Sequence, residues 1–363
     1  MVVNKIPQYL YDPQLVLNVL KIFGLGAMAF AIGMFTAPAL TNFLYRHKLW
    51  KKTVRDKSID GKPLEVFIKY HKDKEIGTPR FGGLLIWTIP LALAAIFVSL
   101  SRTNFWVFEK LDFFSRSQTW LPFFALIAGA VIGLIDDYLQ TRGQGKYVGG
   151  GLSLKTRLLV MALIGLAAGI WFYFKLDWRT LHIPGFGDVW IGVWYIPLFI
   201  IAMLATYSGG VIDGIDGLAG GSFATIFAAF AAITFFKGQV DLAAFCTTIV
   251  GASLAFLWFN IPPARFYMGE TGTMALCAAL TVVAFLSDSV MLLPIIAILL
   301  VLEAASVIIQ LLSKKIFKRK VFIASPFHHH LEAKGWPQYK ITMRFWVIGI
   351  VAAIIGVALS LFG

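Results

Sequence analysis

Two aspartate motifs in this sequence combine carboxylates with features that suit phosphate chemistry. Asp136 and Asp137 are adjacent and close a long apolar run. Adjacent residues on a helix point about 100° apart, so we expect these carboxylates to have different roles, such as metal ligand and base. Asp213 and Asp216 lie three residues apart in the stretch 209–221, which holds six glycines. That composition predicts a broken backbone whose N–H groups could hold phosphate while the acids hold a metal ion or a sugar.

Two later segments add another carboxylate and three imidazoles. The loop 260–273 carries Glu270, which could complete a carboxylate set for Mg²⁺, a hard cation that takes oxygen ligands and substrate phosphates. The segment 325–332 holds three consecutive histidines after a basic run. Three adjacent rings do not converge easily on one ion, and the segment has no cysteine. Contact with a diphosphate is therefore a better interpretation than zinc binding.

Each motif also has a simpler structural interpretation. The pair Asp136 and Asp137 is about as consistent with a solvated helix end as with a site. For the histidines the simpler interpretation is a solvated loop, and we favour a site over it. Glycines alone are consistent with close helix packing. Packing does not account for the aspartates among the glycines, so we favour a site there. Glu303 lies inside an apolar run, where an acid predicts either a functional site or a partner for a lysine.

The composition indicates which elements hold these motifs. Of the 363 residues, 58% are hydrophobic and 14% are charged, whereas soluble domains average about a quarter charged residues. A membrane-spanning helix needs about 20 largely apolar residues. Ten runs approach that length: 15–45, 82–101, 119–135, 157–175, 189–206, 214–236, 239–259, 272–287, 289–312 and 342–362. We expect an all-α integral membrane protein that forms a single polytopic domain over residues 1–363.

The basic residues predict how this domain is oriented. Of the 32 lysines and arginines, 24 fall in the loops after the odd-numbered spans. The positive-inside rule makes that side cytoplasmic and places both termini outside. The acidic motifs other than Glu303 lie on the same side. The net charge of +13 therefore indicates anionic lipid headgroups and polyanionic substrates rather than nucleic acid.

Carboxylates, glycine loops, histidines and lysines on one face suit phosphoryl transfer. Such catalysis depends mostly on positioning and on metal electrostatics. Cys246 and Cys277 each lie in an apolar run, so they predict neither a disulfide nor a thiol nucleophile.

The sequence resembles the polyprenyl-phosphate N-acetylhexosamine-1-phosphate transferases. The matching segments are 78–83 (Thr-Pro-Arg-Phe-Gly-Gly), 136–138 (Asp-Asp-Tyr), 213–218 (Asp-Gly-Ile-Asp-Gly-Leu), 256–260 (Phe-Leu-Trp-Phe-Asn) and 268–270 (Met-Gly-Glu). The segment 326–332 (Pro-Phe-His-His-His-Leu-Glu) is similar to the branch of that family that acts in peptidoglycan synthesis. The matches keep the order of the family along the chain.

The resemblance implies a Mg²⁺-dependent reaction at the cytoplasmic face of the bacterial inner membrane. UDP-N-acetylmuramoyl-pentapeptide and undecaprenyl phosphate would give lipid I and UMP. Asp136 or Asp137 would deprotonate the lipid phosphate, which would attack the β-phosphate. An alternative in which an aspartate first forms a covalent phosphosugar stays open. The resemblance also implies a homodimer.

For individual residues, the resemblance implies three groups. The catalytic group would be Asp136, Asp137, Asp213 and His329. The Mg²⁺ ligand would be Glu270, together with Asp136 and Asp137. The residues in contact with nucleotide, diphosphate or substrate would be Lys74, Thr78, Asp216, Asn260, Tyr267, Thr273, Gln310, His328 and His330, with Tyr267 in place of an aromatic that stacks on uracil.

The chain departs from the family pattern at four positions. Two asparagines of the family are Tyr207 and Gly210 here, an aspartate is Glu270, and a lysine is Gln140. The loss of two amides and a cation from a diphosphate site would cost on the order of several kcal/mol unless other residues compensate.

Three other functions are compatible with parts of the sequence. A sister transferase would move N-acetylglucosamine phosphate, and the histidine motif argues against it. A transporter should hold its ionisable residues near the bilayer midplane in paired broken helices, whereas here they gather at one face. A non-catalytic relative that binds lipid or nucleotide would account for the four departures.

Overall fold

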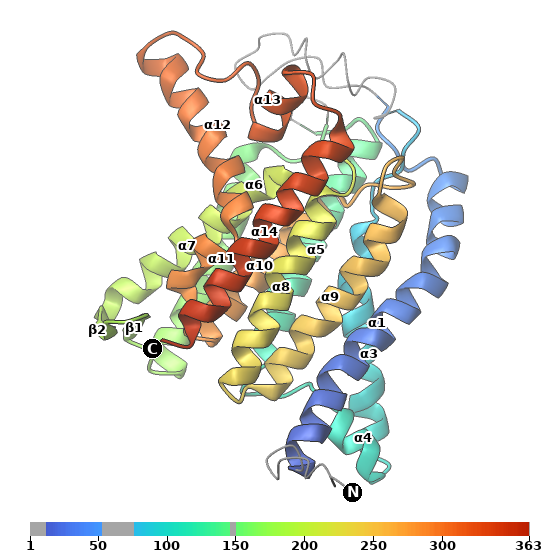
Figure 1. Cartoon of the computed structure of the whole chain (residues 1–363). Coiled ribbons are helices and arrows are strands. Elements are labelled where there is room, and N and C mark those ends of the chain that lie inside the picture. The colour runs from blue at the N-terminus through green and yellow to red at the C-terminus, as the bar shows by residue number, and fades with distance from the viewer. Residues whose placement is uncertain (1–11, 53–75, 146–149, 363) are drawn as a thin grey trace, which may run out of the picture.

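The computed structural model describes residues 12–52, 76–145 and 150–362, which form a bundle of long helices (Figure 1). Nine helical segments among these residues are long and apolar enough to cross a membrane. They are α1 (Pro13–Arg46), α3 (Gly83–Ser101), α5 (Trp120–Thr141), α6 (Leu154–Lys175), α7 (Tyr195–Gly209), α8 (Leu218–Phe236), α9 (Val240–Asn260), α10 (Gly269–Leu286) and α14 (Gln338–Ser360). The span at α7 also includes η2 (Gly192–Trp194) and η3 (Gly210–Ile212).

The apolar run before α14 is broken rather than straight. It forms η4 (Val290–Leu292) and α11 (Leu293–Ile296), then bends by 80° into α12 (Ile298–Ile316). Counted as one span, this bent pair gives ten across the part of the chain that the structure describes. The ten predicted spans agree with this upper count, and the run 289–312 is a bent pair of helices rather than one continuous helix. Glycines of α14 accommodate the bend, because a Cβ at Gly356 would overlap Ile296 and one at Gly349 would lie 3.0 Å from Leu299.

Two short helices and a hairpin complete the described chain. The helices are α4 (Trp106–Leu111) and α13 (Phe327–Ala333). The strands β1 (Thr180–Ile183) and β2 (Gly187–Trp190) pair in antiparallel register, with His182 opposite Asp188. The all-α prediction holds for the bundle, and the hairpin is an addition that it did not include. The four residues of β1 alternate polar and apolar side chains, but those of β2 do not, so the sequence gives only a weak signal for a hairpin.

The helix α10 lies at the centre of the bundle. Of the residues in its apolar window, 94% are buried, against 17% for α1. Glycines of α5 bring the two backbones together, because a Cβ at Gly129 or Gly133 would overlap the backbone of α10. Gly83 of α3 approaches Gly272 of α10 in the same way. The close packing of α5 against α10 places the end of α5 beside the beginning of α10.

The two ends of the bundle differ in what they carry. The N-terminus of α1 and the C-terminus of α14 lie at one end of the bundle, together with α4 and the β1–β2 hairpin (Figure 1). The short helix α13 lies at the opposite end, above α5, α8 and α10 (Figure 1). The C-terminus of α5 and the N-termini of α8 and α10 also lie at the end with α13. The sequence motifs 136–138, 213–218, 268–270 and 326–332 therefore lie at the same end of the molecule.

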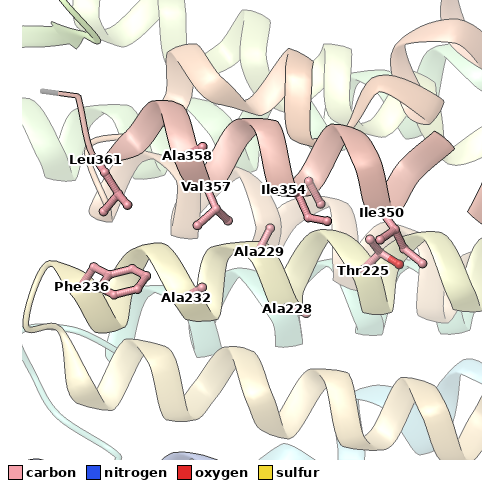
Figure 2. Close-up of a pocket in the computed structure, with 11 residues that line it drawn as sticks. Thr225, Ala228, Ala229, Ala232, Phe236, Ile350, Ile354, Val357, Ala358 and Leu361 are labelled. Carbon is pink, nitrogen blue, oxygen red and sulfur yellow. The ribbon is translucent and has the colours of Figure 1, made fainter. Parts of the chain in front are cut away.

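An apolar groove of about 570 Å³ separates α8 from α14 near the other end (Figure 2). Small side chains of α8, among them Ala228 and Ala232, form one wall, and Ile354 and Val357 of α14 form the other. The groove begins at Thr225, two turns into α8, and continues away from the motifs. It is therefore separate from the candidate site.

Candidate active site

The adjacent acids at the end of α5 bind different partners. Both side chains are buried. Asp136 accepts hydrogen bonds from Nε2 of Gln140 and from the backbone N–H of Leu152, each at 2.5 Å. Asp137 accepts from Nε of Arg80 at 3.2 Å and from the backbone N–H groups of residues 270 and 271 at 3.1 and 2.9 Å. The expectation that the two carboxylates point apart is confirmed.

The N-terminus of α10 gathers three carboxylates. Its first residue, Gly269, has φ of +74°, and a Cβ there would overlap the carboxylate of Asp137. The N–H of Gly269 donates to Oδ2 of Asp213 at 3.2 Å. Glu270 extends from the first turn. Unsatisfied N–H groups and the helix dipole both stabilise negative charge at this position, which accounts for the two aspartates that cap it.

Two arginines neutralise this acidic cluster. Arg80 pairs with Asp137, and Nη1 of Arg157 in the first turn of α6 donates to Oε1 of Glu270. The phenol of Tyr207 donates to the other oxygen, Oε2, at 3.3 Å. Burial raises the pKa of Asp213 to about 6, and the nearby guanidinium of Arg80 opposes that rise.

The glycine-rich segment between α7 and α8 is not a continuous helix. The chain turns at Asp213, which has φ of −76° and ψ of 56°, and Gly217 adopts a left-handed conformation before α8 begins. Asp216 accepts a hydrogen bond from the N–H of Ala264 at 3.2 Å, whereas Asp213 faces α10. The predicted break in the backbone is confirmed. The two aspartates therefore bind different parts of the chain, Asp213 the start of α10 and Asp216 the loop before it.

Backbone pairing joins the 78–83 segment to the loop before α10. The N–H of Tyr267 donates to the carbonyl of Pro79, and the carbonyl of Tyr267 accepts from Gly82, each at 2.8 Å. Thr78 and Tyr267 are both half-buried beside this junction. Thr273 is buried one turn into α10 and donates to the carbonyl of Gly269 at 3.0 Å. Lys74, the other residue predicted for this region, lies outside the described residues.

Asn260 connects two of these segments. Its Oδ1 accepts from the N–H of Gly217 at 3.0 Å, and its Nδ2 donates to the carbonyl of Phe266 at 2.8 Å. Both ends of the buried amide are therefore engaged with backbone. In this structure Asn260 fixes the start of α8 against the loop 261–268.

The three histidines of α13 point to three different partners. His328 is buried, with Nδ1 3.1 Å from Oε2 of Glu303 and with Nε2 against Gly214, where a Cβ would overlap it. His329 lies 2.5 Å from Oε2 of Glu332, and Nδ1 of His330 accepts from the N–H of Ile323 at 3.2 Å. The expectation that the rings do not converge on one ion is confirmed.

The imidazoles differ in their electrostatic surroundings. Burial lowers the pKa of His328, but the charge and hydrogen bond of Glu303, together with the charges of Glu332 and Asp213, outweigh burial, and the net direction is upward. Partial burial and Lys334 lower the pKa of His330. Glu303, singled out as an acid inside an apolar run, thus has a histidine as its partner rather than a lysine.

The side chain of Gln310 hydrogen-bonds to the backbone of the loop that follows α12. Its Oε1 accepts from the N–H groups of Val321 and Phe322, each at 3.0 Å, and its Nε2 donates to the carbonyl of Phe322 at 2.9 Å. The side chain therefore attaches the basic segment after α12 to the helix.

Sequence reasoning did not select Arg80 or Arg157 as site residues. Both are part of the basic side of the molecule, and they contact acids 57 and 113 residues away in the chain. A lone arginine in the first turn of an apolar helix is a signal for Arg157, but the sequence does not indicate which acid it meets. Tyr207 was noted only as a departure, and the structure shows its contact with a second departure, Glu270.

The carboxylates fit a hard divalent cation. Asp136, Asp137, Asp213 and Glu270 offer only oxygen atoms, the ligand type that Mg²⁺ takes. These carboxylates repel one another, since the charge of Glu270 raises the pKa of Asp213. A cation among them would relieve the repulsion between the acids. The donor chemistry therefore suits Mg²⁺. Among the described residues, however, no three of these acids place ligand oxygens within 4.8 Å of one another, so an ion would have to draw the carboxylates together.

The fold is that of a multi-pass membrane protein. Residues 119–288 match the family described as "Glycosyl transferase family 4". The chain is 34% identical to the phospho-N-acetylmuramoyl-pentapeptide-transferases of Chloroflexus aurantiacus and Chloroflexus aggregans, over 93% of this chain and 89% of each relative. It is 33% identical to the enzyme of that name from Listeria welshimeri, over 93% of this chain and 97% of the relative. The chain belongs to the family of phospho-N-acetylmuramoyl-pentapeptide-transferases.

Proposed function

We propose that the chain transfers phospho-N-acetylmuramoyl-pentapeptide from its UDP carrier to undecaprenyl phosphate, with lipid I and UMP as products. The observation that supports this most strongly is the cluster of Asp137, Asp213 and Glu270 at the N-terminus of α10, with Arg80 and Arg157 beside it. Acids and guanidinium groups together suit a reaction between two phosphates. The acids can take a proton or hold a cation, and the arginines can bind diphosphate oxygens.

Within this proposal, the residues of α5 act on the lipid phosphate. Asp136 or Asp137 accepts its proton, after which the phosphate oxygen attacks the β-phosphate of the donor and UMP leaves. Asp213, whose pKa is raised by burial to about 6, would sit beside the nucleotide and the metal ion. Asp136, Asp137 and Glu270 would hold Mg²⁺, which when bound would neutralise the charge of the diphosphate.

The remaining site residues fall into contact and positioning roles. Lys74, Thr78, Tyr267 and Thr273 would bind the nucleotide or diphosphate, with the ring of Tyr267 against uracil. Asp216, Asn260 and Gln310 would act through the loops that they hold, because their side chains hydrogen-bond to backbone groups of those loops.

The histidine motif of α13 resembles the branch of the family that acts in peptidoglycan synthesis, and this resemblance favours the peptidoglycan donor over UDP-N-acetylglucosamine. The histidines lie at the same end of the bundle as the carboxylates, and Nε2 of His328 meets Gly214 beside Asp213. His329 and His330 are partly exposed and would contact the diphosphate.

The proposal includes the setting of the reaction. The active site would face the cytoplasm at the bacterial inner membrane, both termini would lie outside, and the enzyme would work as a homodimer among membrane lipids. Chemical cross-linking of the protein in native membranes tests the dimer. A single cross-linked species at twice the mass of the chain supports it, and monomer alone contradicts it.

The reaction is tested by UMP release from purified protein in detergent. The assay contains undecaprenyl phosphate, Mg²⁺ and either UDP-N-acetylmuramoyl-pentapeptide or UDP-N-acetylglucosamine, with Asp137→Asn as the control variant. We expect release with the first donor only, dependence on Mg²⁺, and at least a hundredfold loss in the variant, in line with the removal of a general base, worth roughly 10²–10⁴ in rate. Release with UDP-N-acetylglucosamine and not with UDP-N-acetylmuramoyl-pentapeptide would establish the sister transferase. No release with either donor from folded protein would contradict catalysis.

A further inference from the structure

Two of the positions at which this chain departs from its family's pattern are in direct contact. By the resemblance, Tyr207 stands where the family has an asparagine and Glu270 where it has an aspartate. The phenol of Tyr207 donates to Oε2 of Glu270 at 3.3 Å, while Arg157 occupies Oε1. Both oxygens of this carboxylate are therefore already bound by protein groups.

The extra methylene of Glu270 makes this arrangement possible. The backbone N–H of residue 270 is fixed by Asp137 at 3.1 Å, so the start of α10 does not move freely toward Arg157. A glutamate carries its carboxylate one carbon further from that fixed backbone than an aspartate does. The longer side chain reaches the first turn of α6 and the end of α7, where Arg157 and Tyr207 lie.

The ion pair is shielded from water. The side chain of Arg157 is 8% exposed and that of Glu270 is 19% exposed. Solvent therefore screens the pair much less than a surface pair. A cation that binds Glu270 must either displace the guanidinium or tolerate its charge nearby, and both reduce the affinity for a metal ion.

We propose that Arg157 competes with the divalent cation for Glu270, and that Tyr207 holds the carboxylate in the arginine-bound state. The free protein then binds the cation weakly, and an anion that draws Arg157 away, such as the diphosphate of the donor, releases Glu270 for the metal. This proposal rests on the metal site of the proposed function, but it makes a statement about binding that does not depend on turnover.

The test measures Mn²⁺ binding by electron paramagnetic resonance of the free ion. It uses the full-length protein in detergent, without nucleotide or lipid. We expect Arg157→Gln to bind Mn²⁺ roughly tenfold more tightly than the unsubstituted chain, because a positive charge close to the ion is removed. Arg157→Lys keeps the charge and should bind as weakly as the unsubstituted protein. Tyr207→Phe should tighten binding by a few-fold, since one hydrogen bond to the competing state is lost.

Glu270→Gln gives the background of the measurement. Among the described residues, the group whose ligand atoms already lie close enough together to take a cation is His182, Asp188 and Asp288, at the hairpin end of the molecule. Any Mn²⁺ bound there persists in Glu270→Gln and is subtracted. The double variant Arg157→Gln/Glu270→Gln should lose the whole gain of Arg157→Gln.

Two outcomes would overturn the proposal. One is Mn²⁺ binding by Arg157→Gln that is no tighter than that of the unsubstituted chain, in protein whose melting temperature shows it to be folded. The other is a gain that survives in the double variant, which would place the competing site elsewhere. A protein without transferase activity can still give the expected pattern, so failure of the proposed function and failure of this inference are distinguishable.

Discussion

At the scale of single residues, Gly269 is the position where a small change should have a large effect. It has φ of +74°, and a Cβ there would overlap the carboxylate of Asp137. Gly269→Ala should therefore displace Asp137 from the N–H groups of α10. We expect UMP release to fall at least a hundredfold, while the strained backbone itself costs only about 1 kcal/mol.

Gly143 provides the matched control for that substitution. It has φ of +65°, but a Cβ there would meet no atom within 4 Å. Gly143→Ala thus carries the same backbone strain without the overlap, and we expect it to retain activity. Equal losses of activity in the two variants would show that strain, and not the position of Asp137, is responsible.

The buried pair of His328 and Glu303 predicts a pH-dependent stability. The folded protein raises the pKa of His328 above its ordinary value of about 6.5. A raised histidine pKa contributes stability that is fully present below the ordinary value and is lost as the pH rises through the raised value. The melting temperature in detergent should therefore fall as the pH increases above neutrality.

Glu303→Gln separates this effect from other titrations. The carboxylates of Glu332 and Asp213 also raise the pKa of His328, so the variant should weaken the pH dependence rather than abolish it. It should also lower the melting temperature at pH 6, where the histidine is charged. Glu109→Gln, a change at an exposed acid of α4, serves as the control. An unchanged pH profile in Glu303→Gln would contradict the assignment to this pair.

The sequence predicted the acids of the site better than their counter-ions. Asp137, Asp213 and Glu270 follow apolar runs or glycines, so their positions at helix ends could be inferred from the chain alone. Arg80 and Arg157 reach them from segments far away in the sequence, and such pairing depends on how α3, α5, α6 and α10 pack. The side-chain amides of Asn260 and Gln310 hydrogen-bond to backbone groups, and a pattern of residue types cannot predict those contacts either.

At the scale of elements, the attachment of the basic segment to α12 depends on Gln310. Three hydrogen bonds join its side chain to Val321 and Phe322. Gln310→Ala removes them, and each contributes about 1 kcal/mol. We expect trypsin to cleave the run 318–320 at least roughly tenfold faster in this variant, because cleavage follows local opening of the backbone.

Gln14→Ala is a suitable comparison for the cleavage experiment. Gln14 is exposed on α1, and its side chain donates to Asn18 on the same helix. That substitution should leave cleavage at 318–320 unchanged. If Gln310 instead contacts the donor, its variant would raise KM with no change in the rate of cleavage, and the positioning role would be wrong.

The bend between α11 and α12 shows where an apolar pattern stops being informative. The run 289–312 has the composition of a straight span, yet it turns by 80° around Ala297. The cause is packing rather than local sequence. Ile296 packs against Gly356 of α14, where a Cβ would overlap it. After the bend, Leu300 packs in the same way against Gly209 of α7. Small residues on partner helices, far away in the chain, thus decide where the run breaks.

At the scale of the whole molecule, the distribution of charge predicts the orientation in the membrane. The positive-inside rule favours a cytoplasmic position for the end of the bundle with α13. Phe186 at the hairpin is 88% exposed, and Lys320 after α12 is exposed at the opposite end. A membrane-impermeant maleimide should label Phe186→Cys in intact spheroplasts and Lys320→Cys only after the membrane is opened.

The native cysteines make this labelling experiment interpretable. Cys246 and Cys277 are both buried, so the unsubstituted protein should give little signal before or after the membrane is opened. Each variant is then read against its own permeabilised sample. The reverse pattern, with Lys320→Cys labelled in intact spheroplasts, would place the acidic cluster outside. In that orientation a nucleotide donor made in the cytoplasm could not reach Asp137 and Glu270, and the proposed reaction would fail with it.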